Sequence, residues 1–367
     1  MKIRRIHFYQ IKEKAMILLT KIMAKRGEKI SLHRKKNVYK DIQLTKEEIK
    51  KINSFYRDNF GKTVSFDWHR LYKGYTGKFD ARYIPDYIYS GYIEPRWNKK
   101  EYAVALSDKN LQSIVFSQVK DVRIPNTYVK CINGLLMNNN SEQIDFDKAY
   151  DILRDSGETI IKKTVDTDSG RDVQLYDLHD GYDLLTKKKL TQILSSLSDN
   201  YVAQECIKPL PILSQIYSQS INTFRVISYI WNSQFFIAPI GLRIGRNGSK
   251  VDNIHAGGIM IAVHDDGSLE EYALSVTGER FYKHPDTGTV FKDIKFDFID
   301  RIKEAAIALH KRIPELGIIS WDLTIDKNGN LVLIESNTWG QAIWLTQSIH
   351  GVSFFGENTA SILHSLQ

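Results

Sequence analysis

Two hydrophobic patterns follow one another along the chain, and the change comes near residue 157. Before it, apolar residues recur at helical spacing, and helices are predicted at residues 107–120 and 145–156. Thr45 and Glu48 form a capping-box pair, so a helix is expected to begin there and run toward Gly61. After residue 157 short β-rich runs dominate, and strands are predicted at residues 159–163, 173–177, 201–207, 223–231, 234–243 and 258–263. A long helix near residues 296–312 completes a pattern that predicts an α+β fold with a helical N-terminal region.

A hairpin near the C-terminal end is the strongest local signal. Two apolar runs, at residues 318–325 and 331–336, flank the dipeptide Asn328-Gly329. This dipeptide favours a two-residue turn, in which Lys327 would pair with Asn330. The register of the whole hairpin follows from that turn.

Counting outward from the turn places Asp322 directly opposite Glu335. Asn337 then points to the same face, because side chains alternate along a strand. Two facing carboxylates repel by roughly 0.2–1 kcal/mol even where exposed, so a positive charge is expected between them. Three oxygen ligands suit Mg²⁺ or Mn²⁺. The alternative is a hairpin with surface acids, but four consecutive apolar residues at 331–334 indicate a strand buried on both faces.

Charge is unevenly distributed along the 367 residues, whose net charge is +8. Residues 1–40 contain thirteen lysines and arginines against Glu13 and Glu28, so the rest of the chain is slightly acidic. We expect this segment to form a basic amphipathic arm, whose apolar stripe comprises Ile3, Phe8, Ile11, Ala15, Leu18 and Ile22. Such an arm suits an anionic membrane surface or an acidic partner, or it docks on the body by its apolar stripe. No nucleic-acid partner is expected, because no nucleic-acid-binding motif accompanies the charge.

Several protein classes are excluded by missing patterns. The apolar stretches are too short for a membrane span or a signal peptide, and Cys131 and Cys206 cannot form a disulfide framework. We therefore expect a cytoplasmic protein, with the arm as a route to the inner membrane surface. The chain has no P-loop, no GxGxxG, no GxSxG and no HExxH, and residues 166–170 depart from a calcium loop at their glycine.

A predicted strand, residues 158–162, runs through a polar loop at residues 164–170 into a second strand. Such a flap can lay backbone N–H groups over phosphates, with Lys162 as a point charge. A plain surface hairpin with an exposed lysine is the alternative. Further on, Arg225 and Arg243 stand on adjacent predicted strands, where two guanidiniums would clamp a carboxylate or phosphate. The pair Gly257-Gly258 permits close backbone approach to a ligand.

In their order along the chain, these features resemble the ATP-grasp superfamily. The chain is most similar to its sugar-transfer-associated group, over residues 65–360. The resemblance is carried by a phosphate lysine and flap, an adenine hinge, an RxN…GG frame, a D…ExN triad, and the stretches YIPDYIYSGYIEP, LSDKN and HPDTG. The flap departs from the family pattern, with a single glycine and with Lys163 where proline is common.

The resemblance implies two α+β lobes that enclose ATP and Mg²⁺ or Mn²⁺. Together with the charge and the change of pattern at residue 157, it leads us to expect four segments: the arm at 1–40, a pre-grasp region at 41–156, a small lobe at 157–208 and a large lobe at 209–367. It assigns Lys162, Ser169 and Gly170 to phosphate. It implies that the hinge residues Gln204, Glu205 and Ile207 bind adenine. It implies that Asp322, Glu335 and Asn337 bind the metal. Arg225 and Arg243 are expected at phosphate or acyl phosphate, and Asn253, His255 and Gly258 on the substrate side.

Three functions are compatible with this resemblance. The first is a carboxylate-amine ligase that works through an acyl phosphate, with a small or sugar-linked carboxylate and an amine as substrates, in surface polysaccharide or sugar-conjugate synthesis. The second is a phosphotransferase that acts on a hydroxyl group. The third is an ATP-binding module without turnover, which the intact metal triad argues against.

Overall fold

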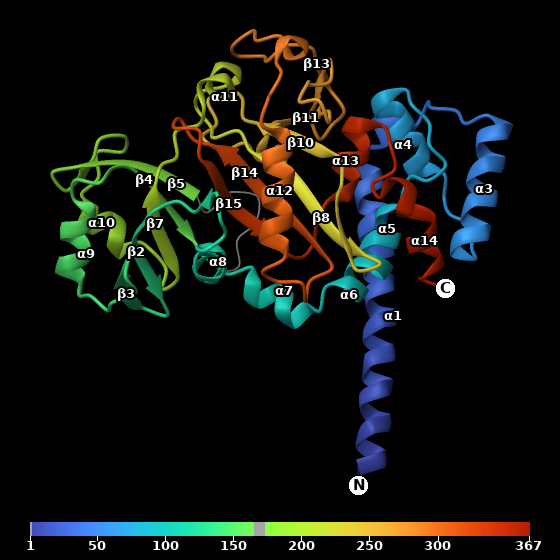
Figure 1. Ribbon diagram of the computed structural model, residues 1–367, viewed down its shortest axis with the longest axis horizontal. Helices are drawn as coiled ribbons and strands as arrows, with labels where there is room; N and C mark the ends of the chain where they lie inside the picture. The colour runs from blue at the N-terminus through green and yellow to red at the C-terminus, as the bar shows by residue number, and fades with distance from the viewer. Residues whose placement is uncertain (1, 165–172) are drawn as a thin grey trace.

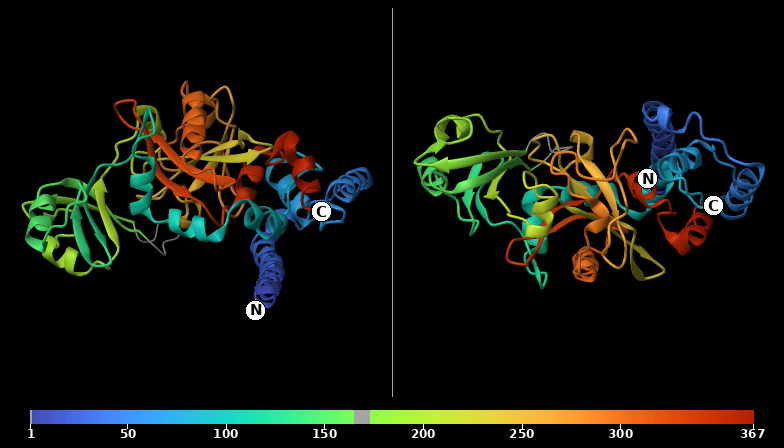
Figure 2. Two further views of the ribbon diagram at one scale, coloured as in Figure 1. Left: turned by 60° about the horizontal axis from the view of Figure 1, so that its bottom comes forward. Right: turned by 90° about the horizontal axis from the view of Figure 1, so that it is seen from above.

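The computed structural model describes residues 2–164 and 173–367, and the side chains of residues 15–164 and 173–367. Its α+β fold contains two separate β-sheets and a helical N-terminal region (Figure 1). The small sheet lies at one end of the molecule, the helical region at the other, and the large sheet between them (Figure 2).

The N-terminal region consists of helices, as expected. They are α1 (Lys2–Arg34), α2 (Lys36–Tyr39), α3 (Lys46–Phe60), α4 (Asp67–Thr76), α5 (Asp86–Ile88), the π-helix η1 (Tyr89–Ile93), α6 (Glu94–Trp97), α7 (Lys100–Leu106) and α8 (Lys109–Phe116). The capping box at α3 is confirmed, because Glu48 N donates to Thr45 Oγ1 at 3.1 Å and Thr45 N donates to the Glu48 carboxylate at 2.7 Å. The helix ends at Gly61, whose φ of +71° glycine adopts without strain.

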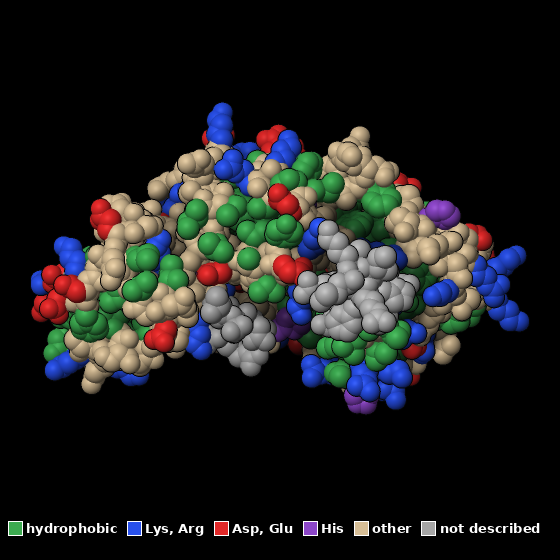
Figure 3. All heavy atoms as spheres, turned by 90° about the horizontal axis from the view of Figure 1, so that it is seen from below, with side chains coloured by type: hydrophobic (Ala, Val, Ile, Leu, Met, Phe, Trp, Pro, Cys, Tyr) green, Lys and Arg blue, Asp and Glu red, His purple; other side chains and the backbone are tan. Residues whose placement is uncertain are grey.

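The N-terminal arm is partly docked. The first half of α1 projects from the body, and Figure 3 views the molecule from the side toward which it projects (Figures 1 and 3). Its second half packs on the body through Ala24 and Leu32. The expected apolar stripe does not make this contact, since Leu18 and Ile22 are exposed.

The small sheet has the order β3-β2-β7-β4-β5-β6. Its strands are β2 (Thr127–Ile132), β3 (Leu135–Asn138), β4 (Gly157–Lys163), β5 (Val173–His179), β6 (Tyr182–Asp183) and β7 (Tyr201–Glu205). Helices α9 (Phe146–Leu153) and α10 (Leu190–Ser195) complete its core. The expected boundary at residue 157 is therefore wrong, because the β2–β3 hairpin and α9 already belong to this lobe. Strand β2 pairs with β7, a long-range contact that no local pattern shows.

The large sheet has the order β1-β15-β14-β8-β10-β11-β12-β13, and β9 also pairs with β8. Its strands are β1 (Val122–Arg123), β8 (Phe224–Trp231), β9 (Gln234–Ile237), β10 (Ile240–Ile244), β11 (Ile259–Val263), β12 (Ala273–Leu274), β13 (Arg280–Phe281), β14 (Ile318–Ile325) and β15 (Leu331–Asn337). The strand expected at residues 234–243 is two strands, because Pro239 cannot donate to a ladder.

Helices cover both faces of the large sheet. Helix α12 (Ile299–His310) shares a core with Leu242 and Ile261, whereas α13 (Ile343–His350) packs against Met260 and Ala262, which face the other way along β11. The remaining helices are α11 (Pro211–Ile216), η2 (Ile254–Ala256), η3 (Phe291–Asp293), η4 (Gly356–Asn358) and α14 (Thr359–His364).

The hairpin β14–β15 confirms that Asp322 pairs with Glu335, but the expected turn is wrong. Asp326, and not Lys327, pairs with Asn330, so the loop has three residues and carries Gly329 at a φ of +81°. The longer loop is stabilised by Asp326, whose carboxylate accepts hydrogen bonds from the N–H groups of Asn328 and Asn330, both at 2.9 Å.

A β-bulge restores the expected register. Leu323 pairs with Leu333 while Asp322 pairs with Glu335, so Ile334 is an extra residue on β15. The longer loop and the bulge shift the count in opposite directions and cancel. Asp322 and Glu335 therefore face each other because the loop and the bulge act together, and not because of a two-residue turn.

Candidate active site

A cavity of about 640 Å³ lies between the two sheets. The small lobe contributes apolar residues of β4 and β5 and the end of β7, and the large lobe contributes charged residues of β8, β10, β14 and β15. The lining includes every described residue that the sequence assigned to the site except Gly258, namely Lys162, Gln204, Glu205, Ile207, Arg225, Arg243, Asn253, His255, Asp322, Glu335 and Asn337. Ser169 and Gly170 lie outside the described residues.

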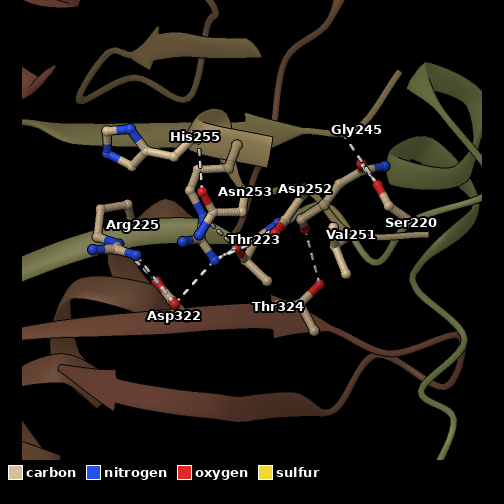
Figure 4. Close-up of polar contacts among 12 residues, drawn as sticks. Ser220, Thr223, Arg225, Gly245, Val251, Asp252, Asn253, His255, Asp322 and Thr324 are labelled. Carbon is tan, nitrogen blue, oxygen red and sulfur yellow. Dashed lines mark hydrogen bonds and ion pairs between the residues drawn. The ribbon is translucent and has the colours of Figure 1, made fainter. Parts of the chain in front are cut away.

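Two arginines bind Asp322 in the lining of this cavity, and Figure 4 shows Arg225 beside Asp322. Arg225 Nε and Nη2 donate to the two carboxylate oxygens of Asp322 at 2.7 and 3.2 Å, and Arg243 Nη2 donates to one of them at 2.9 Å. Asp322 is only 2% exposed, and a buried carboxylate requires such partners. Among the described residues, Arg225 Nη1 has no hydrogen-bond partner, so this arginine keeps a donor for a ligand.

Strand pairing explains why these side chains meet. Arg225 on β8 is the direct cross-strand neighbour of Asp322 on β14. Arg243 is held by Thr223 Oγ1, which accepts from its Nη2 at 2.7 Å, and Thr223 in turn donates to Asp252. Asp252 also lies 3.3 Å from Arg243. Sequence reasoning missed Asp252, because no short pattern distinguishes it from a surface acid.

Glu335 faces two lysines. Lys109 Nζ lies 3.1 Å from a Glu335 carboxylate oxygen, and the Lys109 side chain is 8% exposed. Burial, together with the nearby charge of Lys109, lowers the pKa of Lys162 to about 8. Lys162 is half-buried and Lys163 is exposed, and both side chains border the cavity.

Lys109 is a functional candidate that sequence reasoning did not select. It is the first residue of α8, after Asp108, whose side chain accepts from Asn110 N at 2.9 Å and caps the helix. The LSDKN stretch contains this cap pattern, but only the fold brings residue 109 to residue 335. We define Arg225, Arg243, Asp322, Glu335 and Asn337 as the charged floor, with Lys109 and Lys162 beside it.

The charged floor offers a divalent cation an incomplete set of ligands. Asn337 Nδ2 lies 3.5 Å from Asp322 Oδ2, and Glu335 is the cross-strand neighbour of Asp322. The described residues contain no cluster of three or more acids, histidines or cysteines that could hold a metal by itself. Two carboxylates and an amide nevertheless fit Mg²⁺, which usually takes one or two protein carboxylates and completes its shell with phosphates and water.

In the hinge after β7, the polar side chains bind within the protein, whereas one backbone N–H has no partner among the described residues. Glu205 accepts from the N–H of Asn126 at 2.7 Å and pairs with Arg123, so its carboxylate is engaged within the protein. Gln204 Nε2 donates to Thr127 Oγ1 at 3.1 Å. Ile207 is 7% exposed, and its N–H has no hydrogen-bond partner among the described residues. Buried N–H groups are nearly always paired, so this one is available to a ligand in the cavity.

The segment before β11 has a structural role as well. Asn253 Oδ1 accepts from His255 N at 2.8 Å, which fixes the turn that carries the His255 ring over Arg225 (Figure 4). Gly258 is buried and is not among the residues that line the cavity. A Cβ there would lie 2.7 Å from Asp252 O and 3.0 Å from Asn253 O, so glycine is required by the packing of the chain on itself.

Comparison with known proteins identifies the family. The model of the sugar-transfer associated ATP-grasp family matches residues 90–361. The chain belongs to this family. A search of curated proteins finds no match.

Solved structures match this chain at low similarity. N5-carboxyaminoimidazole synthetase from Staphylococcus aureus is 13% identical with a TM-score of 0.39, and covers 68% of this chain and 52% of its own. D-alanyl-alanine synthetase A from Vibrio cholerae is 12% identical with a TM-score of 0.41, and covers 71% and 65%. L-amino acid ligase from Bacillus licheniformis is 12% identical with a TM-score of 0.37, and covers 70% and 48%. This chain therefore spans about half to two thirds of their lengths.

Proposed function

We propose that this ATP-grasp protein is an ATP-dependent, ADP-forming ligase that joins a carboxylate to an amine. The observation that carries the proposal is the convergence of Arg225 and Arg243 on one buried carboxylate beside Glu335 and Asn337. Guanidinium groups match planar carboxylates and phosphates in geometry, and two of them at a cavity base suit a substrate that changes from carboxylate to acyl phosphate.

The lining of the cavity supports one orientation for a bound ATP. The apolar walls on β4 and β5, Ile160, Val173 and Leu175, suit adenine, and the Ile207 N–H is a donor for an acceptor atom of that ring. Phosphates then extend toward Lys162 and Lys109. Mg²⁺ held by Asp322, Glu335 and Asn337 would supply charge neutralisation at the β- and γ-phosphates.

The proposed reaction has two steps. A carboxylate oxygen of the substrate attacks the γ-phosphorus, the bond to the β–γ bridging oxygen breaks, and ADP leaves. The amine then attacks the acyl carbon and loses a proton, and phosphate leaves with the oxygen that came from the carboxylate. Arg225 and Arg243 hold the charge that develops on the transferring group, as preorganised donors do in water-poor sites.

A phosphotransferase is the second candidate, and His255 is the observation that favours it. Burial and the nearby charges of Lys35, Arg225 and Arg243 lower the pKa of His255, so the ring is neutral near pH 7. A neutral imidazole at the cavity wall can accept a proton from a hydroxyl nucleophile. A module without turnover is the third candidate, which the intact Asp322, Glu335 and Asn337 disfavour.

Oxygen labelling separates these candidates. Pools of amino acids and uronic acids, the latter chosen because of the family's association with sugar transfer, are first tested for ADP release. The active carboxylate is then labelled with ¹⁸O. A ligase releases labelled phosphate, and hydroxylamine intercepts the acyl phosphate as a hydroxamate. Unlabelled phosphate during productive turnover, or a stable phosphorylated product, would identify a phosphotransferase. ATP binding without ADP release in any pool would identify a module.

A further inference from the structure

Helix α1 presents apolar side chains to solvent on the side away from the body. Leu19, Ile22, Met23 and Ile30 are 53%, 46%, 63% and 55% exposed. Their spacing of three, four and eleven residues from Leu19 places them along one side of the helix. We call these four residues the outer stripe.

The opposite side of α1 is already engaged. Trp68 Nε1 donates to the Glu28 carboxylate at 2.6 Å, Lys21 Nζ lies 4.4 Å from the centre of the Tyr92 ring, and Leu32 is buried. A Cβ on Gly91 would lie 3.0 Å from Ala24 Cβ, so helix and body are in close contact here. These contacts fix the rotation of α1 and leave the outer stripe uncovered.

Beyond the body, apolar surface surrounds the helix. Met16, Ile17 and Leu18 are 65%, 47% and 60% exposed, and together with Leu19 they point in four directions around the axis. Among the described side chains of α1, only this one turn is apolar all round, and apolar side chains exposed in every direction favour a covering surface of protein or lipid. Exposed hydrophobic residues gathered in this way mark an interaction surface.

The positive charge of α1 indicates which kind of surface would cover its apolar side chains. Arg26 and Lys29 are exposed beside the outer stripe, and residues 1–40 contain thirteen lysines and arginines against two acids. In Figure 3, hydrophobic and basic side chains lie side by side on the face from which α1 projects. A second copy of the helix would bring two strongly basic segments together, whereas an anionic lipid surface complements both the charge and the apolar side chains.

We propose that α1 docks the protein on an anionic membrane surface, with the outer stripe and residues 16–18 entering the headgroup region. The helix would lie in the surface and not cross it, because no helix in the described part of the chain is long and apolar enough to span a bilayer. At 33 residues, α1 extends for about 50 Å, long enough to lie partly beyond the body. This proposal does not depend on the ATP site.

Vesicle co-sedimentation of the full-length protein tests the proposal. We expect binding to phosphatidylcholine vesicles that contain phosphatidylglycerol, and at least about 10-fold weaker binding to phosphatidylcholine alone. The triple variant Leu19→Ser, Ile22→Ser, Met23→Ser should lose about 10-fold or more of the binding to anionic vesicles. A matched control is Leu184→Ser, Leu185→Ser on the small lobe, where the side chains are 45% and 55% exposed, and it should bind like the wild type.

A charge pair separates lipid from other partners. Arg26→Gln, Lys29→Gln should weaken anionic-vesicle binding, whereas the exposed pair Lys187→Gln, Lys188→Gln should not. Circular dichroism and thermal unfolding confirm that each variant is folded. Absence of wild-type binding to anionic vesicles at low salt, or equal binding by the triple serine variant, would overturn the proposal. A dimer in light scattering that the triple variant abolishes, without vesicle binding, would identify a second copy as the occupant instead.

Discussion

Positively charged side chains cluster in the cavity and on helix α1, and the two clusters differ in burial and in their partners. In the cavity, Arg225, Arg243 and Lys109 lie 2.7 to 3.1 Å from carboxylates on neighbouring strands. On α1, Arg26 and Lys29 are exposed among apolar side chains. Buried charges held in fixed geometry select a small ligand with a defined arrangement of oxygens, whereas exposed charges select a diffuse surface and are screened by salt. The following predictions test this difference.

The largest effect is expected from Glu335→Gln. The substitution keeps the size of the side chain but removes the negative charge that faces Lys109 and serves the proposed metal site. ATP turnover should fall by at least about 100-fold, as for the loss of a preorganised charge at a reacting phosphate. The measurement is ADP release at saturating Mg²⁺, with thermal unfolding as the control for folding. Wild-type turnover in this variant would refute the assignment of Glu335 to the site.

A tenfold to hundredfold effect is expected from Lys162→Met. Removal of one charge-assisted contact to phosphate costs about 1.5–3 kcal/mol of binding free energy, which weakens ATP affinity by roughly 10- to 100-fold. Lys163→Met is the matched control. Its side chain also borders the cavity, but it is more exposed to solvent, so this variant should lose less affinity. Calorimetry measures both affinities. Equal losses at the two positions would mean that the strand's inward face is misassigned.

A smaller effect concerns pH. Burial lowers the pKa of Lys162 to about 8, so the lysine is charged below that pH and neutral above it. Phosphates favour the charged form, and ATP affinity should therefore decrease as pH rises through about 8. The conservative variant Lys162→Arg stays charged throughout this range and should lose the dependence. The same decline of affinity in Lys162→Arg and in the wild type would assign the pH effect to another group.

The smallest effect on chemistry is expected from deletion of residues 2–14. These residues belong to the projecting half of α1, and the contacts of Lys21, Glu28 and Leu32 with the body are retained. Steady-state ADP release should stay within about two-fold of wild type, while salt-sensitive vesicle binding weakens because basic residues are lost. A large loss of turnover in a folded truncation would show that the two basic regions are coupled.

Deletion through residue 30 is a different experiment. It would remove Lys21, Ala24 and Glu28, which contact Tyr92, Gly91 and Trp68 of the body. We expect this longer truncation to be destabilised, and a comparison of the two melting temperatures locates the boundary between the projecting and the docked parts of α1.

The local patterns of the sequence determined much of the fold. The capping box at Thr45 could be predicted, because capping depends on residues near one another in the sequence. The order of the motifs also identified the ATP-grasp family, which the family comparison confirms. The hairpin register was correct only because a longer loop and a bulge cancel.

Tertiary structure alone decided which charges meet. Lys109 reaches Glu335, and Asp252 supports Arg243, through contacts between segments far apart in the chain. The same is true of β2, whose pairing with β7 moves the start of the small lobe ahead of residue 157. Helix α1 shows the converse: its sequence predicts the basic and apolar character, but only docking on Trp68 and Tyr92 determines which side stays exposed. Local patterns report periodicity and propensity, whereas partners between distant segments depend on how the whole chain packs.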